Sequence, residues 1–182
     1  KNGHKRWLEV TETPVYNEAG KVIAVEGVAH EITDRKIADE AIRESEETLR
    51  AIFDSTADAI SIAGFDGTII NVNDAAVAMH RVKSKAEIIG RSGFDLVKPE
   101  ELPKVHGLLK ELPVKRCVSN IETRFVRING NEEFPAEVSI SLLQDKAGNP
   151  VGFTSITKDI TERKLAEKEK ENLQQQLNHA QK

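Results

Sequence analysis

A six-residue segment that occurs twice constrains this chain more than any other feature. Residues 31–36 read Glu-Ile-Thr-Asp-Arg-Lys, and residues 159–164 read Asp-Ile-Thr-Glu-Arg-Lys. The similarity continues upstream, with an offset of 127 residues for the first matches and of 128 from Leu8 onward, which suggests an insertion at Pro135. A repeat of that length is a domain and not a solenoid unit, so the two segments should close two related domains.

Each copy of the segment predicts the start of a helix. Thr33 and Thr161 are expected to be N-caps, and the acidic residue after each lies in the first turn, where the helix macrodipole favours an anion. On this prediction the chain is a piece of a longer multidomain protein. Its four parts would be the C-terminal strands of a truncated preceding domain (1–33), a helical linker (34–54), one complete domain (55–160) and a C-terminal helix (161–182).

Both predicted helices carry apolar residues at coiled-coil spacing. The seam of the first helix consists of Ala38, Ile42, Ser45, Leu49 and Ile52. The seam of the second consists of Ala166, Leu173, Leu177 and Ala180. Because the surrounding faces are densely charged, the pattern favours a homodimer that pairs through these flanking helices. The alternative is that each helix packs on its own domain.

Residues 55–160 predict an α+β domain, with a five-stranded antiparallel sheet and short helices on one face. Two strands over 58–72 meet at the turn Phe65-Asp66-Gly67, and three further strands over 121–160 follow after the helices. Between the second and third strands we expect three helices. They are one capped by Asn73, one that begins with a capping box at Ser84, and one from Pro103 to Pro113.

Several function classes are disfavoured by the sequence. The net charge is −4 and no basic run occurs, which argues against a nucleic-acid partner. No apolar run reaches membrane-spanning length, so we expect no membrane contact within this fragment. A phosphate-binding glycine loop, a nucleophile elbow and a His-Glu-x-x-His run are all missing from the sequence, so we predict that the fragment is not an enzyme. The single cysteine, Cys117, is in accord with a reducing compartment.

The order and spacing of several short segments resemble a PAS sensor domain. The segments are Ala59-Ile60, 65–73, 87–91, Asn129-Gly130 and Asp159-Ile160-Thr161, and they cover about residues 46–164, with 1–33 as the tail of another copy. The resemblance implies the PAS fold. It also implies that Asp159, Thr161 and Arg163 pass a signal from the last strand to the outgoing helix, while the first copy departs by having Glu31 for the aspartate.

The end of the chain is similar to the run that precedes the phosphoacceptor helix of sensor histidine kinases. This similarity covers residues 171–182. It implies that the full-length protein is a cytoplasmic histidine kinase of a two-component system, with adjacent PAS and kinase domains as partners. The sequence stops short of the phosphoacceptor helix, so His179 is not a candidate phosphorylation site.

PAS domains bind haem, flavin, small metabolites or nothing, so the ligand has to be inferred from the residues. The pocket lining is predicted from the large apolar residues of the strands and short helices. These are Ile60, Ile62, Ile70, Met79, Ile89, Phe94, Leu109, Ile121, Phe125 and Ile140. The alternative is that a domain of this size needs most of them for its own core, which favours a small ligand or none.

Haem is one candidate cofactor, with His106 as the axial ligand of the iron and the only candidate metal ligand. His106 lies seven residues after Pro99, a spacing that resembles the proximal histidine of haem-binding oxygen sensors of the family. Ile121 stands where those sensors carry a distal arginine, so such a haem would sense CO, NO or redox state. Gly93 stands where photoactive flavin members carry a cysteine, which argues against flavin photochemistry.

Three hypotheses for the function follow from the sequence. The first is a non-catalytic module that senses a small ligand or relays a signal through dimeric helices. The second is a haem-binding gas or redox sensor that uses His106. The third is a structural spacer with a filled core, which dimerises and binds no ligand.

Overall fold

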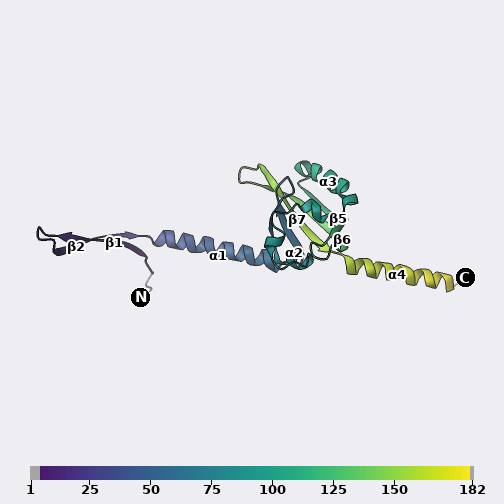
Figure 1. The fold of residues 1–182 in the computed structure, drawn as a ribbon, viewed down its shortest axis with the longest axis horizontal. Helices are drawn as coiled ribbons and strands as arrows, with labels where there is room; N and C mark the ends of the chain where they lie inside the picture. The colour runs from purple at the N-terminus through teal and green to yellow at the C-terminus, as the bar shows by residue number, and fades with distance from the viewer. Residues whose placement is uncertain (1–4, 181–182) are drawn as a thin grey trace. The chain divides into compact units, whose positions relative to one another are not determined.

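The structure, a computed structural model, describes residues 5–180 and divides into two units. The first unit ends at Ala51 and the second begins at Ile52, so the division falls within helix α1 (Thr33–Ser55) (Figure 1). Among residues 5–180 there is no helix with the length and hydropathy that a membrane-spanning segment requires.

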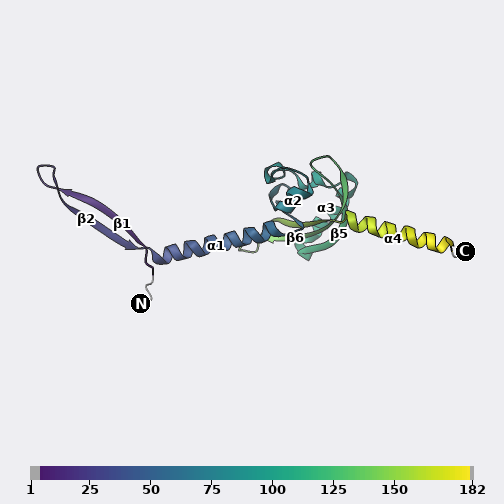
Figure 2. The same cartoon turned by 90° about the horizontal axis from the view of Figure 1, so that it is seen from below.

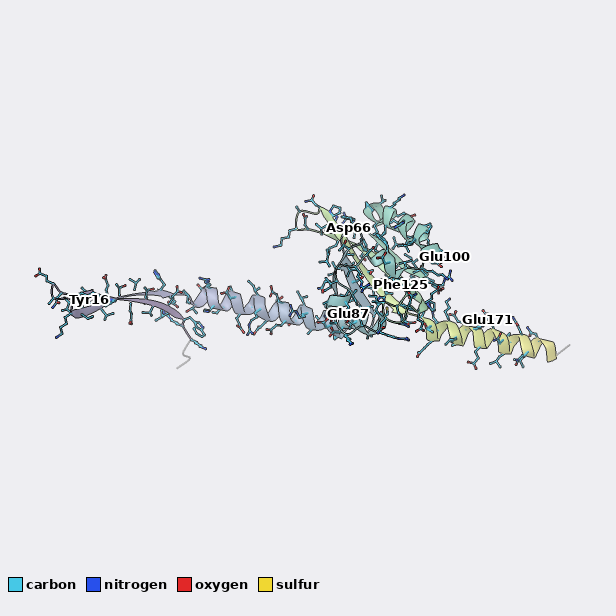
Figure 3. All side chains as sticks on the ribbon, in the orientation of Figure 1. Tyr16, Asp66, Glu87, Glu100, Phe125 and Glu171 are labelled. Carbon is cyan, nitrogen blue, oxygen red and sulfur yellow. The ribbon has the colours of Figure 1, made fainter. Side chains whose placement is uncertain are left out.

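The first unit contains an antiparallel hairpin of β1 (Leu8–Tyr16) and β2 (Val22–Glu31). Its turn is closed by the Asn17 side-chain oxygen, which accepts hydrogen bonds from the N–H groups of Ala19 at 3.1 Å and Lys21 at 2.9 Å. Every residue of both strands is exposed, including Tyr16, which is labelled in Figure 3. The hairpin therefore has no hydrophobic core within the part of the chain that the structure describes.

The second unit is built on the predicted five-stranded antiparallel sheet. Its strands are β3 (Ala59–Ala63), β4 (Ile69–Val72), β5 (Cys117–Val126), β6 (Glu133–Gln144) and β7 (Pro150–Asp159). They lie in the order β4-β3-β7-β6-β5. The first and last strands of the domain, β3 and β7, are therefore paired in the middle of the sheet.

The short helices lie between β4 and β5 in the chain and cover one face of the sheet (Figure 2). They are α2 (Asp74–Met79), the 3₁₀ turns η1 (Lys85–Glu87), η2 (Gly93–Leu96) and η3 (Pro99–Glu101), and α3 (Leu102–Lys115). Helix α4 (Thr161–Ala180) follows β7. The other face of the sheet carries the alternate residues of each strand.

The core lies between the sheet and these helices, as the alternation of β6 illustrates. Phe134, Ala136, Val138 and Ile140 are buried, and their neighbours in sequence are half-buried or exposed. This period of two places every second side chain on the helix-covered face, as predicted from the sequence.

Two predictions about the helices were wrong. Pro113 does not end α3, which continues to Lys115 and ends where Arg116 adopts φ 60° and donates its N–H to Leu112 O at 2.7 Å. A proline costs a helix one hydrogen bond, and the packing of Leu112 against Val138 and Ile140 of the sheet compensates for that loss. Ser84 begins only the 3₁₀ turn η1, and its side chain makes no capping hydrogen bond.

The hairpin of the first unit repeats the last hairpin of the second unit pair for pair. Leu8 is opposite Glu31, as Ala136 is opposite Asp159, and all nine pairs of β1 and β2 recur in β6 and β7 at an offset of 128 residues. Each hairpin also has a register irregularity at the same place before its turn. The sequence repeat is therefore also a repeat of strand register.

The repeat includes the start of the strands, where the sequence suggested an insertion. The N–H of Ile32 donates to Trp7 O at 2.9 Å, and the N–H of Ile160 donates to Pro135 O at 3.0 Å. The offset between Trp7 and Pro135 is already 128, so the prediction that Pro135 is inserted between the aligned positions was wrong.

Candidate functional site

A cavity of about 80 Å³ lies between the sheet and the short helices. Its wall combines strand residues, such as Phe125 of β5, which is labelled in Figure 3, with residues of α2, η2 and α3. Most of the lining is apolar, and the polar side chains in it are Ser61, His80, Thr123, Ser155 and Thr157.

The structure brings together seven of the ten residues predicted to line a pocket. Those that line the cavity are Ile60, Met79, Phe94, Leu109, Ile121, Phe125 and Ile140. Ile62, Ile70 and Ile89 do not line it, which corrects the prediction at three positions.

Two of these corrections are errors of a single residue. Ile70 is 58% exposed while its neighbour Ile69 is 3% exposed, and Ile89 is 41% exposed while Ile88 is 1% exposed. Ile69 and Ile70 lie in β4, where adjacent side chains point to opposite faces, whereas Ile88 and Ile89 lie in the turn after η1. In both places an error of one residue exchanges a core position for a surface position. Paired isoleucines offer no difference in hydropathy from which to choose.

His106 does not lie in the cavity wall. Its side chain is exposed on α3, and its ring packs edge-on against Phe94 with 4.8 Å between the ring centroids. The cavity is also small beside the several hundred Å³ that pockets for large ligands occupy. A haem with His106 as axial ligand therefore does not fit this site, and the same volume argues against a flavin. Among the described residues, no group of three His, Cys, Asp or Glu side chains is placed to hold a metal ion.

Two polar atoms in the cavity wall are buried without a hydrogen-bond partner. They are Nδ1 of His80 and Oγ1 of Thr123, and each residue is 6% exposed. Burial, together with the positive charge of Arg127, lowers the pKa of His80 from 6.5 to about 4. His80 is therefore a neutral imidazole at neutral pH.

Neither residue was selected as a site residue from the sequence. The histidines other than His106 are His4, His30, His80 and His179, and no metal-ligand spacing among them singles out His80. Ile121, Thr123 and Phe125 alternate with charged neighbours, so the sequence pattern treats Thr123 as one more strand residue. The one available signal was that Thr123 shares the inward face with Ile121 and Phe125.

Asn73 holds the N-terminal end of α2 in place and was correctly predicted as its N-cap. Its side-chain oxygen accepts from Ala76 N–H at 3.1 Å and from Ile60 N–H at 2.9 Å. Its amide nitrogen donates to Phe53 O at 3.1 Å and Asp58 O at 2.9 Å. One fully buried side chain thus joins α2, β3 and the end of α1.

Asp159 and Thr161, two of the three predicted relay residues, are in direct contact. Oδ1 of Asp159 accepts from the N–H of Thr161 at 2.9 Å and from its hydroxyl at 2.5 Å. Burial would raise the pKa of Asp159, but the hydrogen bonds from Thr161 and Arg127 outweigh it and hold the pKa below the ordinary value.

The prediction that Thr161 is the N-cap of α4 was wrong by one residue. Ile160 is the cap, because its carbonyl accepts the first intrahelical hydrogen bond, from Lys164 N–H at 2.9 Å. The same correction applies to Thr33, since Ile32 O accepts from Lys36 N–H at 3.0 Å. The threonine hydroxyl therefore ties the first helical residue back to the strand instead of capping the helix.

Arg127 links Asp159 to the end of α2, and no pattern in the sequence indicated this role. Its Nη2 donates to Asp159 Oδ2 at 2.7 Å, and its Nη1 donates to the backbone carbonyl of Met79 at the end of α2. Its guanidinium carbon also lies 4.1 Å from the centre of the Phe134 ring. Arg127 is 8% exposed, so the charge is paired in a largely dry environment.

Arg163, the third predicted relay residue, makes a separate set of contacts. Its guanidinium donates to Glu137 at 3.0 Å and to Glu122 at 2.8 Å. Lys164 also pairs with Glu122, at 2.7 Å. Arg163 thus attaches the first turn of α4 to β5 and β6 without touching Asp159.

Comparisons with known proteins agree on the fold. A family model described as "PAS domain" matches residues 57–162. An uncharacterized protein of Sinorhizobium fredii, y4lL, is 27% identical over 163 residues, which are 89% of this chain and 19% of that protein. The chain thus spans about a fifth of the length of this curated relative.

Two solved structures illustrate the similarity. The PAS domain of an HTR-like protein from Haloarcula marismortui has a TM-score of 0.59 and 24% identity, over 69% of this chain and 99% of that one. A PAS domain from a two-component sensor histidine kinase has a TM-score of 0.54 and 16% identity, over 64% and 97%. At this level of identity the two structures establish the fold alone.

Proposed function

This chain belongs to the PAS domain family, and we propose that it is a sensory and signal-relay module of a larger signalling protein. PAS domains are generally sensory and not catalytic. In the proposed mechanism, occupation of the cavity changes the position of α2 and of the end of β7. Helix α4 carries that change to an output domain.

The contacts of Arg127 are the observation that supports this proposal most directly. One guanidinium donates both to the carbonyl that ends α2 and to the carboxylate that ends β7. The other oxygen of that carboxylate holds the first residue of α4. A displacement of α2 therefore alters the hydrogen bonds of α4 through two side chains, Arg127 and Asp159, without any large movement of the sheet.

We also propose that two copies of the chain pair through their flanking helices. On α1 the seam residues Ile42, Leu49 and Ile52 are 58%, 64% and 59% exposed. On α4, Leu173 and Leu177 are exposed as well. Exposed large apolar side chains at coiled-coil spacing leave contact with water when a partner helix covers them, which favours pairing.

The remaining parts of the proposal concern the larger protein. The repeated register supports the interpretation that β1 and β2 are the last hairpin of a preceding PAS domain. The kinase-like run at 171–182 and the likeness to a histidine kinase PAS domain support a cytoplasmic histidine kinase with adjacent PAS and kinase domains.

Hydrogen exchange of the whole chain tests the relay. In Arg127→Gln, the amides of Thr161 to Lys164 should exchange about tenfold faster than in the wild type, because the anchor of Asp159 is lost. The control is Arg124→Gln, which removes a surface pair with Glu101 from the end of β5, three residues before Arg127. Equal exchange in α4 of both variants would contradict the relay.

A second measurement uses the intact signalling protein. Asp159→Ala should abolish the dependence of its output on the signal, while Asp95→Ala, at an exposed position of η2, should preserve it. If Asp159→Ala leaves the signal dependence unchanged, the chain is better described as a structural spacer.

A further inference from the structure

Two buried polar atoms in the cavity wall lack a hydrogen-bond partner. Nδ1 of His80 and Oγ1 of Thr123 are buried, line the same cavity and have no partner. Buried polar atoms in native proteins are bonded in the great majority of cases, because leaving one unpaired costs stability. By contrast, Ser61 and Ser155 in the same wall bond each other at 2.6 Å, so neither hydroxyl is without a partner.

The chemistry of these two atoms limits what can bond them. A neutral imidazole nitrogen is a donor or an acceptor according to its tautomer, and a threonine hydroxyl is both. A hydroxyl or amide group, which can donate and accept, satisfies the pair in either tautomer. The nearest cation, Arg127, is already paired with Asp159 at 2.7 Å, so the site offers no free positive charge to an anion.

The size of the cavity limits the rest of the molecule. Its volume is about 80 Å³. That is about half of the roughly 150 Å³ of an engineered apolar cavity that binds benzene. The molecule should therefore be smaller than benzene and have roughly three to five non-hydrogen atoms. Its hydrocarbon part would face apolar wall residues such as Ile121, Val138 and Ile140.

We propose that the cavity binds a small neutral molecule with one hydroxyl or amide group and a short hydrocarbon part, which His80 and Thr123 recognise by hydrogen bonds. This inference rests on the proposed sensory function and names the class of ligand for it. The position of His80 connects such a ligand to the relay. The His80 ring packs edge-on against the Phe134 ring, with 6.4 Å between the ring centroids. The guanidinium group of Arg127 lies over the Phe134 ring.

A binding experiment on the whole chain tests the ligand class. Amide NMR spectra are recorded while 1-propanol, propanamide, propionate or dissolved xenon is added. 1-Propanol and propanamide should produce saturable shifts at cavity residues such as Ala59 and Val138, and propionate should produce none. Xenon, which needs no hydrogen bond, reports whether the cavity is accessible.

Matched variants identify the recognition residues. Thr123→Val keeps the side-chain shape, and it should weaken 1-propanol and propanamide binding about tenfold, which is the loss of one hydrogen bond, without weakening xenon binding. Thr154→Val makes the same change on β7, between the cavity residues Phe153 and Ser155 and hence on the opposite face, and should leave all affinities unchanged.

Thermal unfolding of the ligand-free variants provides an independent measurement. Thr123→Val should raise the melting temperature, because it removes a buried unpaired hydroxyl, and Thr154→Val should not. The proposal is overturned if neither 1-propanol nor propanamide gives saturable shifts, or if Thr123→Val binds them as tightly as the wild type. Either result would assign the polar atoms to ordered water and would leave the Arg127 exchange experiment, and with it the relay, unaffected.

Discussion

Arg127 and Asp159 form an ion pair at 2.7 Å between the turn that precedes β6 and the end of β7. Their side chains are 9% and 30% exposed, so the pair is shielded from solvent more than most surface pairs. The same carboxylate fixes Thr161 with its other oxygen. The pair thus stabilises the domain and positions the helix that leaves it.

Asp159→Asn should destabilise the second unit by about 2 kcal/mol, because Arg127 and Thr161 both lose a charged acceptor. Urea denaturation of both proteins at pH 7 measures the difference. Asp95→Asn, at an exposed site, should stay within about 0.5 kcal/mol of the wild type. A loss no larger than that of the control would show that the ion pair adds nothing to stability.

The neutral, buried His80 predicts a specific pH dependence. The unfolded chain protonates this histidine near its ordinary pKa of 6.5, whereas the folded chain does so only near 4. Between these values the unfolded state binds the additional proton, so the free energy of unfolding falls as the pH falls from about 6.5 to about 4. The limit is about 3 kcal/mol, from roughly 2.5 units at about 1.36 kcal/mol each.

Denaturation curves at pH 7 and pH 4.5 measure this dependence. His80→Leu should remove most of the difference between the two, and His106→Leu, which removes an exposed histidine, should preserve it. Asp159 acts in a separate range, since its pKa is lowered and the stability it contributes is lost only at pH values below 4. A pH difference that survives in His80→Leu would assign the effect to other groups.

Asn73→Ala should be among the most destabilising polar substitutions in the chain. It removes four hydrogen bonds from a fully buried position and leaves backbone groups of Ile60 and Asp58 without partners. The expected loss is about 3 kcal/mol, measured by chemical denaturation. Asn71→Ala, two residues away and exposed, is the matched control and should change stability by less than about 0.5 kcal/mol.

Ile42→Lys should weaken the proposed dimer by about two orders of magnitude, because it places a charge in the helix seam. Light scattering over a concentration series gives the mass of the particle. Glu47→Lys changes the charge by more, but it lies off the seam beside Arg43, so it should leave the dimer intact. A wild-type chain that stays monomeric at high concentration would refute the dimer directly.

The strands of this protein were predictable because their signals are local. Alternation over β6, the turn residues near Asn129-Gly130 and the cap at Asn73 each depend on residues within a few positions of one another. The choice between Ile69 and Ile70 was not predictable in this way, because register depends on the partner strand.

The contacts among Arg127, Asp159 and Thr161 were only half predictable for a similar reason. The segment at Asp159 and Thr161 is contiguous and repeated, so it is visible in the sequence. Arg127 reaches Met79 and Asp159 from 48 and 32 residues away, and no local pattern distinguishes it from a surface arginine. The burial of His80 is likewise a property of the assembled fold.

The equal register of the two hairpins has a consequence for how such proteins can be shortened or extended. A deletion that joins Ile32 directly to Thr161 would remove one complete period of 128 residues. Helix α4 would then follow the hairpin of β1 and β2, whose register equals that of β6 and β7. The Thr33 hydroxyl bonds Glu31 as the Thr161 hydroxyl bonds Asp159, so the splice would fall between interchangeable ends. Modules of this kind can be added or lost by unequal recombination without redesign of the connection between them.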